Sequence, residues 1–431
     1  MMMNKTLLKY TALSSCVLFA LTANANANEE GFTFHGYAKG GIGITNDDIL
    51  SPGGYDWANN GVNIFRLPGN TYTNSSGGRL GNEANWLELH LGYGWAQQND
   101  MDWAIHSNIV HGDGGLALDE LAIKSAGVVP SNPEATIWAG KRYFNRVETF
   151  LTDSQPMSND GLGFGIENYD LGFGKLHLGV TRNIYEEAPQ DGAGELVAFT
   201  SSLSFIELSD NLTLNLYANY GTPFSPDSEN KTDDKPNAYQ LASKLLLLSR
   251  TGYDELFVRY SKNASGSMTR SWEALPDYQI GGFWQGIHTL TDSYTLSYIW
   301  QHETASFDED ARRRNDIRIK DSHWNAFVAR NTYTWNSRTS TELELGYEFI
   351  DITAIDTTDD GTNSGYKATL SQNLHLAGGF WDRPVIRFFV TYAEQDVETL
   401  AYDRWDLDLN NGVTTGKADA LTFGAQFEAW W

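Results

Sequence analysis

Apolar and polar residues alternate with a period of two along most of this chain. In residues 342–349, Leu343, Leu345 and Tyr347 take one side, and glutamates and a glycine take the other. The same pattern recurs in further segments, at residues 86–93, 175–181, 212–219, 386–392 and 421–431. Such alternation predicts β-strands that have one apolar and one polar face.

The lengths of these segments and of their connections indicate which kind of β protein this is. The predicted strands have about 9–11 residues, enough to cross a bilayer when tilted. Aromatic residues stand near predicted strand ends, where membrane barrels carry aromatic girdles: Trp300, Tyr333, Trp335 and Tyr402. Acidic stretches at 227–236, 307–316 and 351–365 are too long for hairpin turns, whereas 209–211 is a short turn. At ~22 residues per strand and connection, we expect an all-β transmembrane antiparallel β-barrel of about 18 strands.

Residues 1–27 are expected to be a secretory signal peptide. Two lysines precede an apolar run at residues 10–22, and the small-residue motif Ala25-Asn26-Ala27 follows it. We place cleavage after Ala27, with Ala25 as the competing position. The only cysteine, Cys16, lies in this segment, and the apolar run continues past it, which favours an ordinary signal over a lipoprotein signal. Residues 28–431 then form a single porin-like barrel domain without a thiol.

Composition and motifs exclude several classes of function. Asp and Glu number 55 against 30 Lys and Arg, so we expect no nucleic-acid partner, because phosphate backbones need a basic face. A mean hydropathy of −0.41 argues against a bundle of membrane-spanning helices. The chain has no His-Glu-x-x-His and no Gly-x-Ser-x-Gly motif, and we expect neither an enzyme nor a cofactor. Residues 406–412 resemble a calcium loop, but Lys417 replaces the glutamate that such a loop needs, so no metal site is expected.

Several ordered blocks of the sequence resemble one family of outer-membrane channels. The first block is the start at residues 32–43, which begins Phe32-Thr33-Phe34-His35-Gly36-Tyr37, and the last is the ending at residues 423–431. The other blocks are residues 79–83, 88–92, 136–142, 167–176 and 381–384. The chain is similar to the maltoporins, the sugar-specific porins of Gram-negative bacteria. That resemblance implies an 18-stranded barrel with an inward-folded third loop, a homotrimer in outer-membrane lipid, and facilitated diffusion of maltose and maltodextrins.

A channel for sugars needs aromatic rings beside polar groups, because a sugar ring has apolar C–H faces and a rim of hydroxyls. The alternation turns Tyr37, Trp86 and Trp430 toward the lumen, and all three match the aromatic slide of the resembled family. Trp381 matches a further member of that slide. Tyr239 would match another, but the run at residues 241–248 does not determine which face Tyr239 takes.

Charged residues beside the slide match the polar track and constriction of the resembled family. These candidates are Lys39, Arg79, Glu88, Arg146, Glu148 and Asp153, and Gln155 aligns with the family's constriction tyrosine. Asp119 falls near an arginine of that track. Residues 111–115 lack the tryptophan that neighbouring subunits of the family donate, and they form a short loop. These differences predict an abbreviated slide with altered sugar selectivity.

Two alternatives remain on the sequence alone. A general diffusion porin would use the net charge of −25 to concentrate cations at its mouth. A porin for another sugar, such as sucrose, would keep the aromatic lining. The external loops of such a barrel are also candidate receptors for phage.

Overall fold

The computed structural model describes residues 30–46, 65–73, 75–112, 115–182, 196–223, 236–270, 275–315, 317–376, 380–401 and 415–431. The expected signal peptide, Tyr402, the calcium-like segment 406–412 and most of the acidic loop 227–236 lie outside these ranges. None of the helices in the described ranges is both long enough and apolar enough to cross a membrane.

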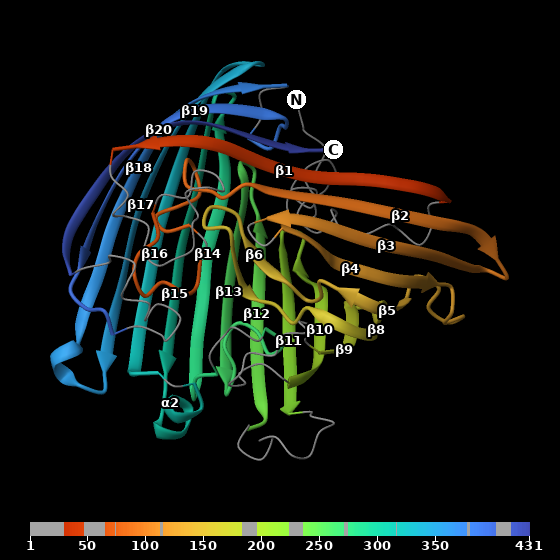
Figure 1. Ribbon diagram of the computed structural model, residues 1–431. Coiled ribbons are helices and arrows are strands. Elements are labelled where there is room, and N and C mark those ends of the chain that lie inside the picture. Colours follow the sequence, from red (N-terminus) through yellow and green to blue (C-terminus); the bar gives the residue numbers. More distant parts are fainter. Residues whose placement is uncertain are drawn as a thin grey trace.

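Eighteen strands form one closed antiparallel barrel (Figure 1). The ring closes where β1 pairs with both β2 and β20, and β9 pairs with β10. In ring order the strands are β1 (Gly31–Thr45), β2 (Trp86–Gln98), β3 (Met101–Gly112), β4 (Gly115–Ala126), β5 (Thr136–Arg142), β8 (Gly161–Asp170), β9 (Lys175–Arg182), β10 (Leu196–Ser209), β11 (Leu212–Pro223), β12 (Ala238–Leu248), β13 (Gly252–Lys262), β14 (Tyr278–Thr291), β15 (Tyr294–Ser306), β16 (Ile319–Asn336), β17 (Thr339–Ala354), β18 (Gly361–His375), β19 (Val385–Val397) and β20 (Gly416–Trp430). The predicted all-β barrel and its strand number are confirmed.

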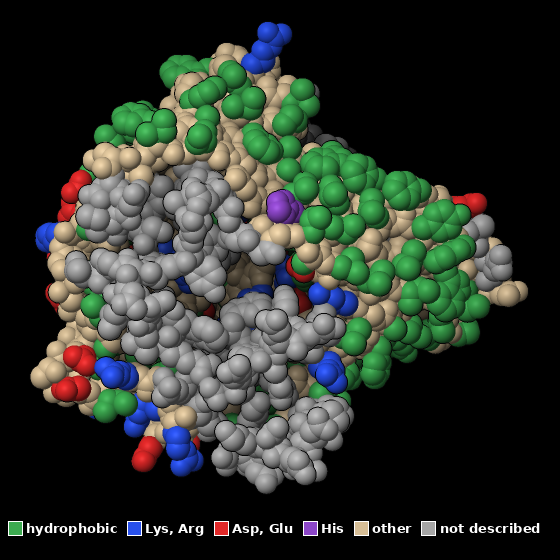
Figure 2. Space-filling view, in the orientation of Figure 1, with side chains coloured by type: hydrophobic (Ala, Val, Ile, Leu, Met, Phe, Trp, Pro, Cys, Tyr) green, Lys and Arg blue, Asp and Glu red, His purple; other side chains and the backbone are tan. Residues whose placement is uncertain are grey.

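The two faces of each strand differ as the alternation predicts. On β17, Leu343, Leu345 and Tyr347 are exposed on the outer face, whereas Glu344 and Glu348 are fully buried on the inner face. Figure 2 shows hydrophobic side chains gathered over the outside of the wall. An apolar exterior around a polar interior is the arrangement of a barrel that lies in lipid.

Some predicted boundaries were wrong. The stretch 351–365 was expected to be a loop, but β17 continues to Ala354 and β18 begins at Gly361, so only a short connection with the 3-10 helix η3 (Thr357–Asp359) remains. At this end of β17 the polarity of the two faces is reversed, because Ile350 and Ile352 are buried on the inner face whereas Thr353 is exposed on the outer face. This reversal hid the continuation of the strand from the pattern. Trp300 lies in the middle of β15, opposite Trp284, and not at a strand end. The turn at 209–211 is confirmed, and the connection 307–316 contains the helix α2 (Glu309–Asn315).

The connection between β1 and β2 packs against the inner faces of β17 and β18. The backbone N–H of Leu80 donates to Glu344 Oε1 at 2.9 Å, and that of Gly77 donates to Glu348 Oε2 at 3.2 Å. Lys367 Nζ on β18 donates to the carbonyl of Leu80 at 2.8 Å. Residues 65–83 are therefore held to the wall by buried polar side chains.

The connection between β5 and β8, residues 143–160, carries a small hairpin of β6 (Val147–Thr149) and β7 (Ser154–Met157). Its tip contacts strands far around the ring. The N–H of Phe150 lies 3.4 Å from Gln285 Oε1 on β14, and Thr152 Oγ1 donates to Gln301 Oε1 on β15 at 3.0 Å. Buried apolar side chains of the hairpin pack with those of β13 to β16.

Gly346 is needed for the contact between β17 and the first connection, because an added Cβ would lie 2.0 Å from the carbonyl oxygen of Gly77. Gly346→Val should displace residues 65–83, since such overpacking costs about 1–3 kcal/mol. A cysteine placed at buried Ser76, in the chain without residues 1–27, reports this displacement. Its maleimide labelling should accelerate roughly tenfold or more in Gly346→Val. The outward-facing Leu345→Ile is the control, and equal labelling in all three backgrounds would contradict the assigned packing.

Candidate functional site

The strands β20, β1 and β2 bring the predicted aromatic and charged residues onto one patch of the inner wall. Tyr37 is the register partner of Trp430, and Lys39 is the partner of both Glu428 and Trp86. Directly opposed residues in antiparallel strands point to the same face. Three of the predicted slide residues therefore lie side by side, with charged groups between them.

Trp86 and Trp430 are each held by a specific neighbour. The Trp86 ring lies against Gly112 on β3, where an added Cβ would be 2.4 Å from Cζ3. Its Nε1 donates to Glu88 Oε1 at 2.7 Å. The Arg383 guanidinium lies over the Trp430 ring, with Cζ 4.4 Å from the ring centroid. Both rings are partly exposed.

Trp381 lies in the connection between β18 and β19. Its ring centroid is 4.7 Å from that of Phe150 at the tip of the 143–160 hairpin, and 5.0 Å from that of Phe380. Trp381 therefore lies next to that hairpin, and its part in the slide stays a prediction.

Tyr239 does not face the lumen, and its placement in the slide was wrong. Its neighbour Gln240 is fully buried and bonds Asn159 of the 143–160 connection, whereas Tyr239 is 50% exposed and shares the outer face with Leu241. Tyr239 lines an apolar groove of about 770 Å³ on the outer surface, next to Tyr220. The leucine run that follows gives no alternation, so only the pairing of β12 with its neighbours determined this face.

Glu428 on β20 is the centre of a buried ion network. It accepts from the Tyr37 hydroxyl at 3.0 Å and lies 3.1 Å from Arg79 Nη2. Arg383 Nη2 approaches its other oxygen at 2.6 Å and Arg387 Nη1 at 3.1 Å. Three guanidinium groups thus compensate one carboxylate, which stabilises a charge that burial alone would make costly.

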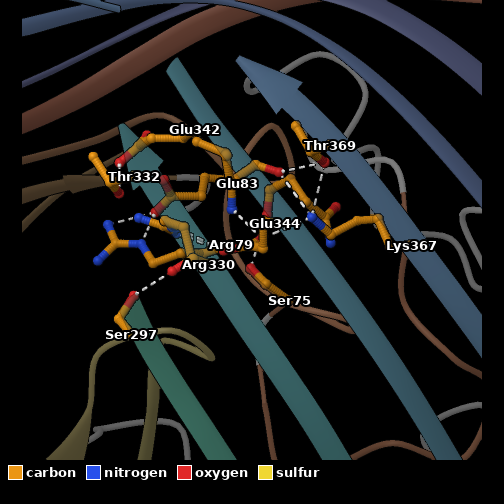
Figure 3. A network of polar contacts seen from close by, with 12 residues as sticks. Ser75, Arg79, Glu83, Ser297, Arg330, Thr332, Glu342, Glu344, Lys367 and Thr369 are labelled. Atoms are coloured by element: carbon orange, nitrogen blue, oxygen red, sulfur yellow. Dashed lines mark hydrogen bonds and ion pairs between the residues drawn. The ribbon is translucent and has the colours of Figure 1, made fainter. Parts of the chain in front are cut away.

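Lys39 links this network to the connection between β1 and β2 and to the 143–160 connection. Its Nζ lies 2.8 Å from Glu83 and 2.8 Å from Asp153. Arg79 Nη2 lies 2.6 Å from Glu83 (Figure 3). Burial opposes the charged form of Glu83, but Arg79 and Lys39 hold the pKa of that carboxyl below its ordinary value.

A second ion cluster lies on the neighbouring strands β16, β17 and β18 (Figure 3). Glu344 is 2.7 Å from Arg330 Nη2 and 2.9 Å from Lys367 Nζ, and all three are buried. The site residues predicted from the sequence did not include this cluster, nor Arg383, Arg387 and Glu428. The alternation could have indicated this cluster, because it already placed Glu344 on the polar face of its strand.

The 143–160 connection carries its own charged group. Arg146 Nη2 lies 2.7 Å from Asp160, its Nη1 lies 3.6 Å from Glu148, and its Cζ stands 3.3 Å from the centroid of the Tyr143 ring. Burial raises the pKa of Glu148 to about 7, although Arg146 opposes this shift. Glu148 therefore changes charge in the physiological pH range.

Gln155 and Asp119, which differ from the residues of the resembled family, each have a hydrogen-bond partner. The Gln155 amide oxygen accepts from Arg270, which comes from the connection between β13 and β14. The Tyr143 hydroxyl donates to Asp119 Oδ2 at 2.6 Å. Residues 112 and 115 pair directly, which confirms that the connection between β3 and β4 is short.

Removing the charge of Glu428 should destabilise the barrel, because three arginines would lose a common partner. Glu428→Gln is expected to lower the free energy of unfolding by about 3–5 kcal/mol. Urea unfolding of the chain folded into lipid vesicles measures this change. Glu309→Gln, an exposed acid on α2, is the matched control. A loss in Glu428→Gln no larger than in the control would mean that the network adds nothing to stability.

The raised pKa of Glu148 predicts a pH-dependent ion preference. Below pH 7 the carboxyl is neutral, and above pH 7 it is ionised. The permeability ratio of cations to anions should therefore rise from pH 6 to pH 8, as measured by the reversal potential in a salt gradient. Glu148→Gln should remove most of that rise, and an undiminished rise in this variant would assign it to other groups.

Comparison with known proteins identifies the family. A solved structure of OprD from Pseudomonas aeruginosa is 9% identical, with a TM-score of 0.50, and the match covers 94% of this chain and 95% of that one. OccK10 (OpdN) from the same species is 10% identical, with a TM-score of 0.49 and coverage of 93% and 99%. At this identity the OprD match supports the barrel fold alone. The family model of the LamB porins matches residues 32–431. The chain, a closed barrel with an apolar exterior and a charged lumen, therefore belongs to the LamB porin family and is an outer-membrane porin.

Proposed function

We propose that this porin binds oligosaccharides of the maltodextrin type and lets them diffuse passively through its lumen, as a homotrimer in the outer membrane. The observation that carries this proposal is the row of Trp86, Tyr37 and Trp430 on adjacent strands. A channel that only sieved solutes by size would have no need of aromatic rings in register. No covalent step is required.

The groups around that row match the chemistry of a sugar. Aromatic faces stack on the apolar C–H faces of the ring, and each such contact is modest in energy. Two charged groups contact the row directly. The guanidinium of Arg383 covers the Trp430 ring, and the carboxylate of Glu88 accepts a hydrogen bond from Trp86. Charged donors and acceptors of this kind can replace the water on sugar hydroxyls. Several weak sites in series allow a sugar both to enter and to leave.

We infer that the 143–160 connection, the third loop of the barrel, folds into the lumen and narrows it. Its contacts with Gln285 and Gln301 on β14 and β15 support this reading, because these strands are distant from β5 and β8 in the ring. Its ion pair between Asp153 and Lys39 on β1 does so from a second direction. Arg146, Glu148, Asp153 and Gln155 would then form the constriction, beside the aromatic row.

The slide is shorter than the resemblance implied. Tyr239 lies on the outer face, and the direct pairing of residues 112 and 115 leaves no long loop to reach a neighbouring subunit. Fewer stacking sites should reduce the gain in affinity from each added glucose unit. We therefore expect maltohexaose to bind more tightly than maltose, with a modest ratio between them.

Single-channel current in a planar bilayer, titrated with maltose, maltohexaose and sucrose, tests this function. The wild-type chain should show saturable block by maltohexaose. Replacing Trp86 and Trp430 together by alanine should weaken that block roughly tenfold to a hundredfold, since two lost stacking contacts cost about 1–3 kcal/mol. Ion conductance without sugar should be retained.

Tyr239→Ala is the matched control, because it removes an aromatic ring from the outer face of the same barrel. Its sugar block should equal that of the wild type. Block by sucrose alone would assign a different sugar to the same site. A current insensitive to all three sugars would make this chain a general porin, and the aromatic row would then be structural.

A further inference from the structure

A β-bulge on β4 turns the side chain of Glu120 toward the interior of the barrel. β3 and β4 pair Asn108 with Glu120 and then Ile109 with Leu118, which leaves Asp119 without a partner in the register. As a result Leu118 and Leu121 are both exposed on the outer face, although they are three residues apart. Glu120 is turned inward, where plain alternation from Leu118 would have directed it outward.

The re-aimed carboxylate meets two histidines. His90 on β2, His106 on β3 and Glu120 each offer one donor atom, and these atoms all lie within 4.8 Å of one another. His90 Nδ1 and His106 Nε2 are 3.2 Å apart. Two nitrogen ligands of a tetrahedral ion, each at 2.0–2.1 Å, stand about 3.3 Å apart. The pair is thus spaced as two ligands of one ion would be.

The carboxylate has an oxygen that the surrounding protein does not satisfy. Glu120 Oε1 accepts from the backbone N–H of Tyr143 at 2.9 Å. Oε2 is buried and accepts no hydrogen bond within the part of the chain that the structure describes. Both polar atoms of the adjacent Asn108 side chain are likewise buried and without partners there. A buried acceptor in this state is destabilising unless something binds it.

A second carboxylate orients the first imidazole. Glu88 Oε2 lies 3.2 Å from His90 Nε2, and the other oxygen of Glu88 accepts from Trp86. A proton on Nε2, held by Glu88, leaves the Nδ1 lone pair directed at the cluster. Metal-binding histidines commonly donate their other N–H to a carboxylate in this way.

We propose that His90, His106 and Glu120 bind one divalent transition-metal ion, of which Zn²⁺ is the type that fits two imidazoles and a carboxylate. The ion would join three adjacent strands. Through Tyr143 it would also hold the start of the 143–160 connection. All three ligands are at most 5% exposed, so the site is structural rather than catalytic. The proposal does not depend on which solute the channel carries.

The test uses the full chain without an affinity tag, extracted from outer membranes, treated with a chelator and dialysed. Titration calorimetry with ZnCl₂ should find one ion bound per chain at this site. His106→Gln and Glu120→Gln should each weaken that binding by roughly tenfold or more. Co²⁺ bound to the wild-type chain should give the visible absorption of a tetrahedral site, and this band should be absent in both variants.

His288→Gln is the matched control, because His288 also lies on a barrel strand and pairs with a carboxylate, Asp254, at 3.3 Å. Its Zn²⁺ affinity should equal that of the wild type. Variants that retain ion conductance are folded. If the variants misfold, the wild-type Co²⁺ spectrum tests the proposal by itself, because a tetrahedral absorption supports the site and an octahedral one contradicts it. Binding that is equal in all four chains, or an octahedral Co²⁺ spectrum from surface carboxylates, would overturn the proposal, as would no binding by the wild type.

Discussion

The structure depends on the requirement that every backbone N–H and C=O in lipid be paired within the protein. Eighteen strands meet it by closing into a ring, where β1 bonds β2 on one side and β20 on the other. Closure forces alternate side chains into the lumen. The same constraint that hides the backbone from lipid therefore also collects polar and aromatic residues in one interior.

The interior then has its own electrostatic problem, because many charged side chains are brought out of bulk water. The solution is pairing across distant parts of the chain. Glu428 on the last strand contacts Arg79 from the connection between β1 and β2, and Lys39 on the first strand contacts Asp153 from the 143–160 connection. These pairs orient the side chains next to the aromatic row. Under the proposed function, sugar recognition would draw on the same groups as stability, which would limit how freely either can vary.

Local departures from the regular barrel coincide with its most specific features. The bulge at Asp119 directs Glu120 to two histidines, and Gly112 provides the space in which the Trp86 ring lies. Gly346 likewise leaves room for the connection between β1 and β2 to pack against β17. In each case one residue changes what its neighbours can contact, while the ring of strands around it is unaltered.

The sequence by itself determined the fold class, the strand number and the face of most strand residues, because lipid and lumen impose opposite polarities on alternate positions. That rule sufficed for Tyr37, Trp86 and Trp430. It did not suffice for Tyr239, which lies beside an unbroken run of leucines, or for Glu120, where a bulge reverses the alternation. The partners of Arg79, Asp153 and Gln155 were also decided only by the tertiary structure. Connections have no periodicity, so which wall they contact follows from closure of the whole barrel and the pairing of its buried charges.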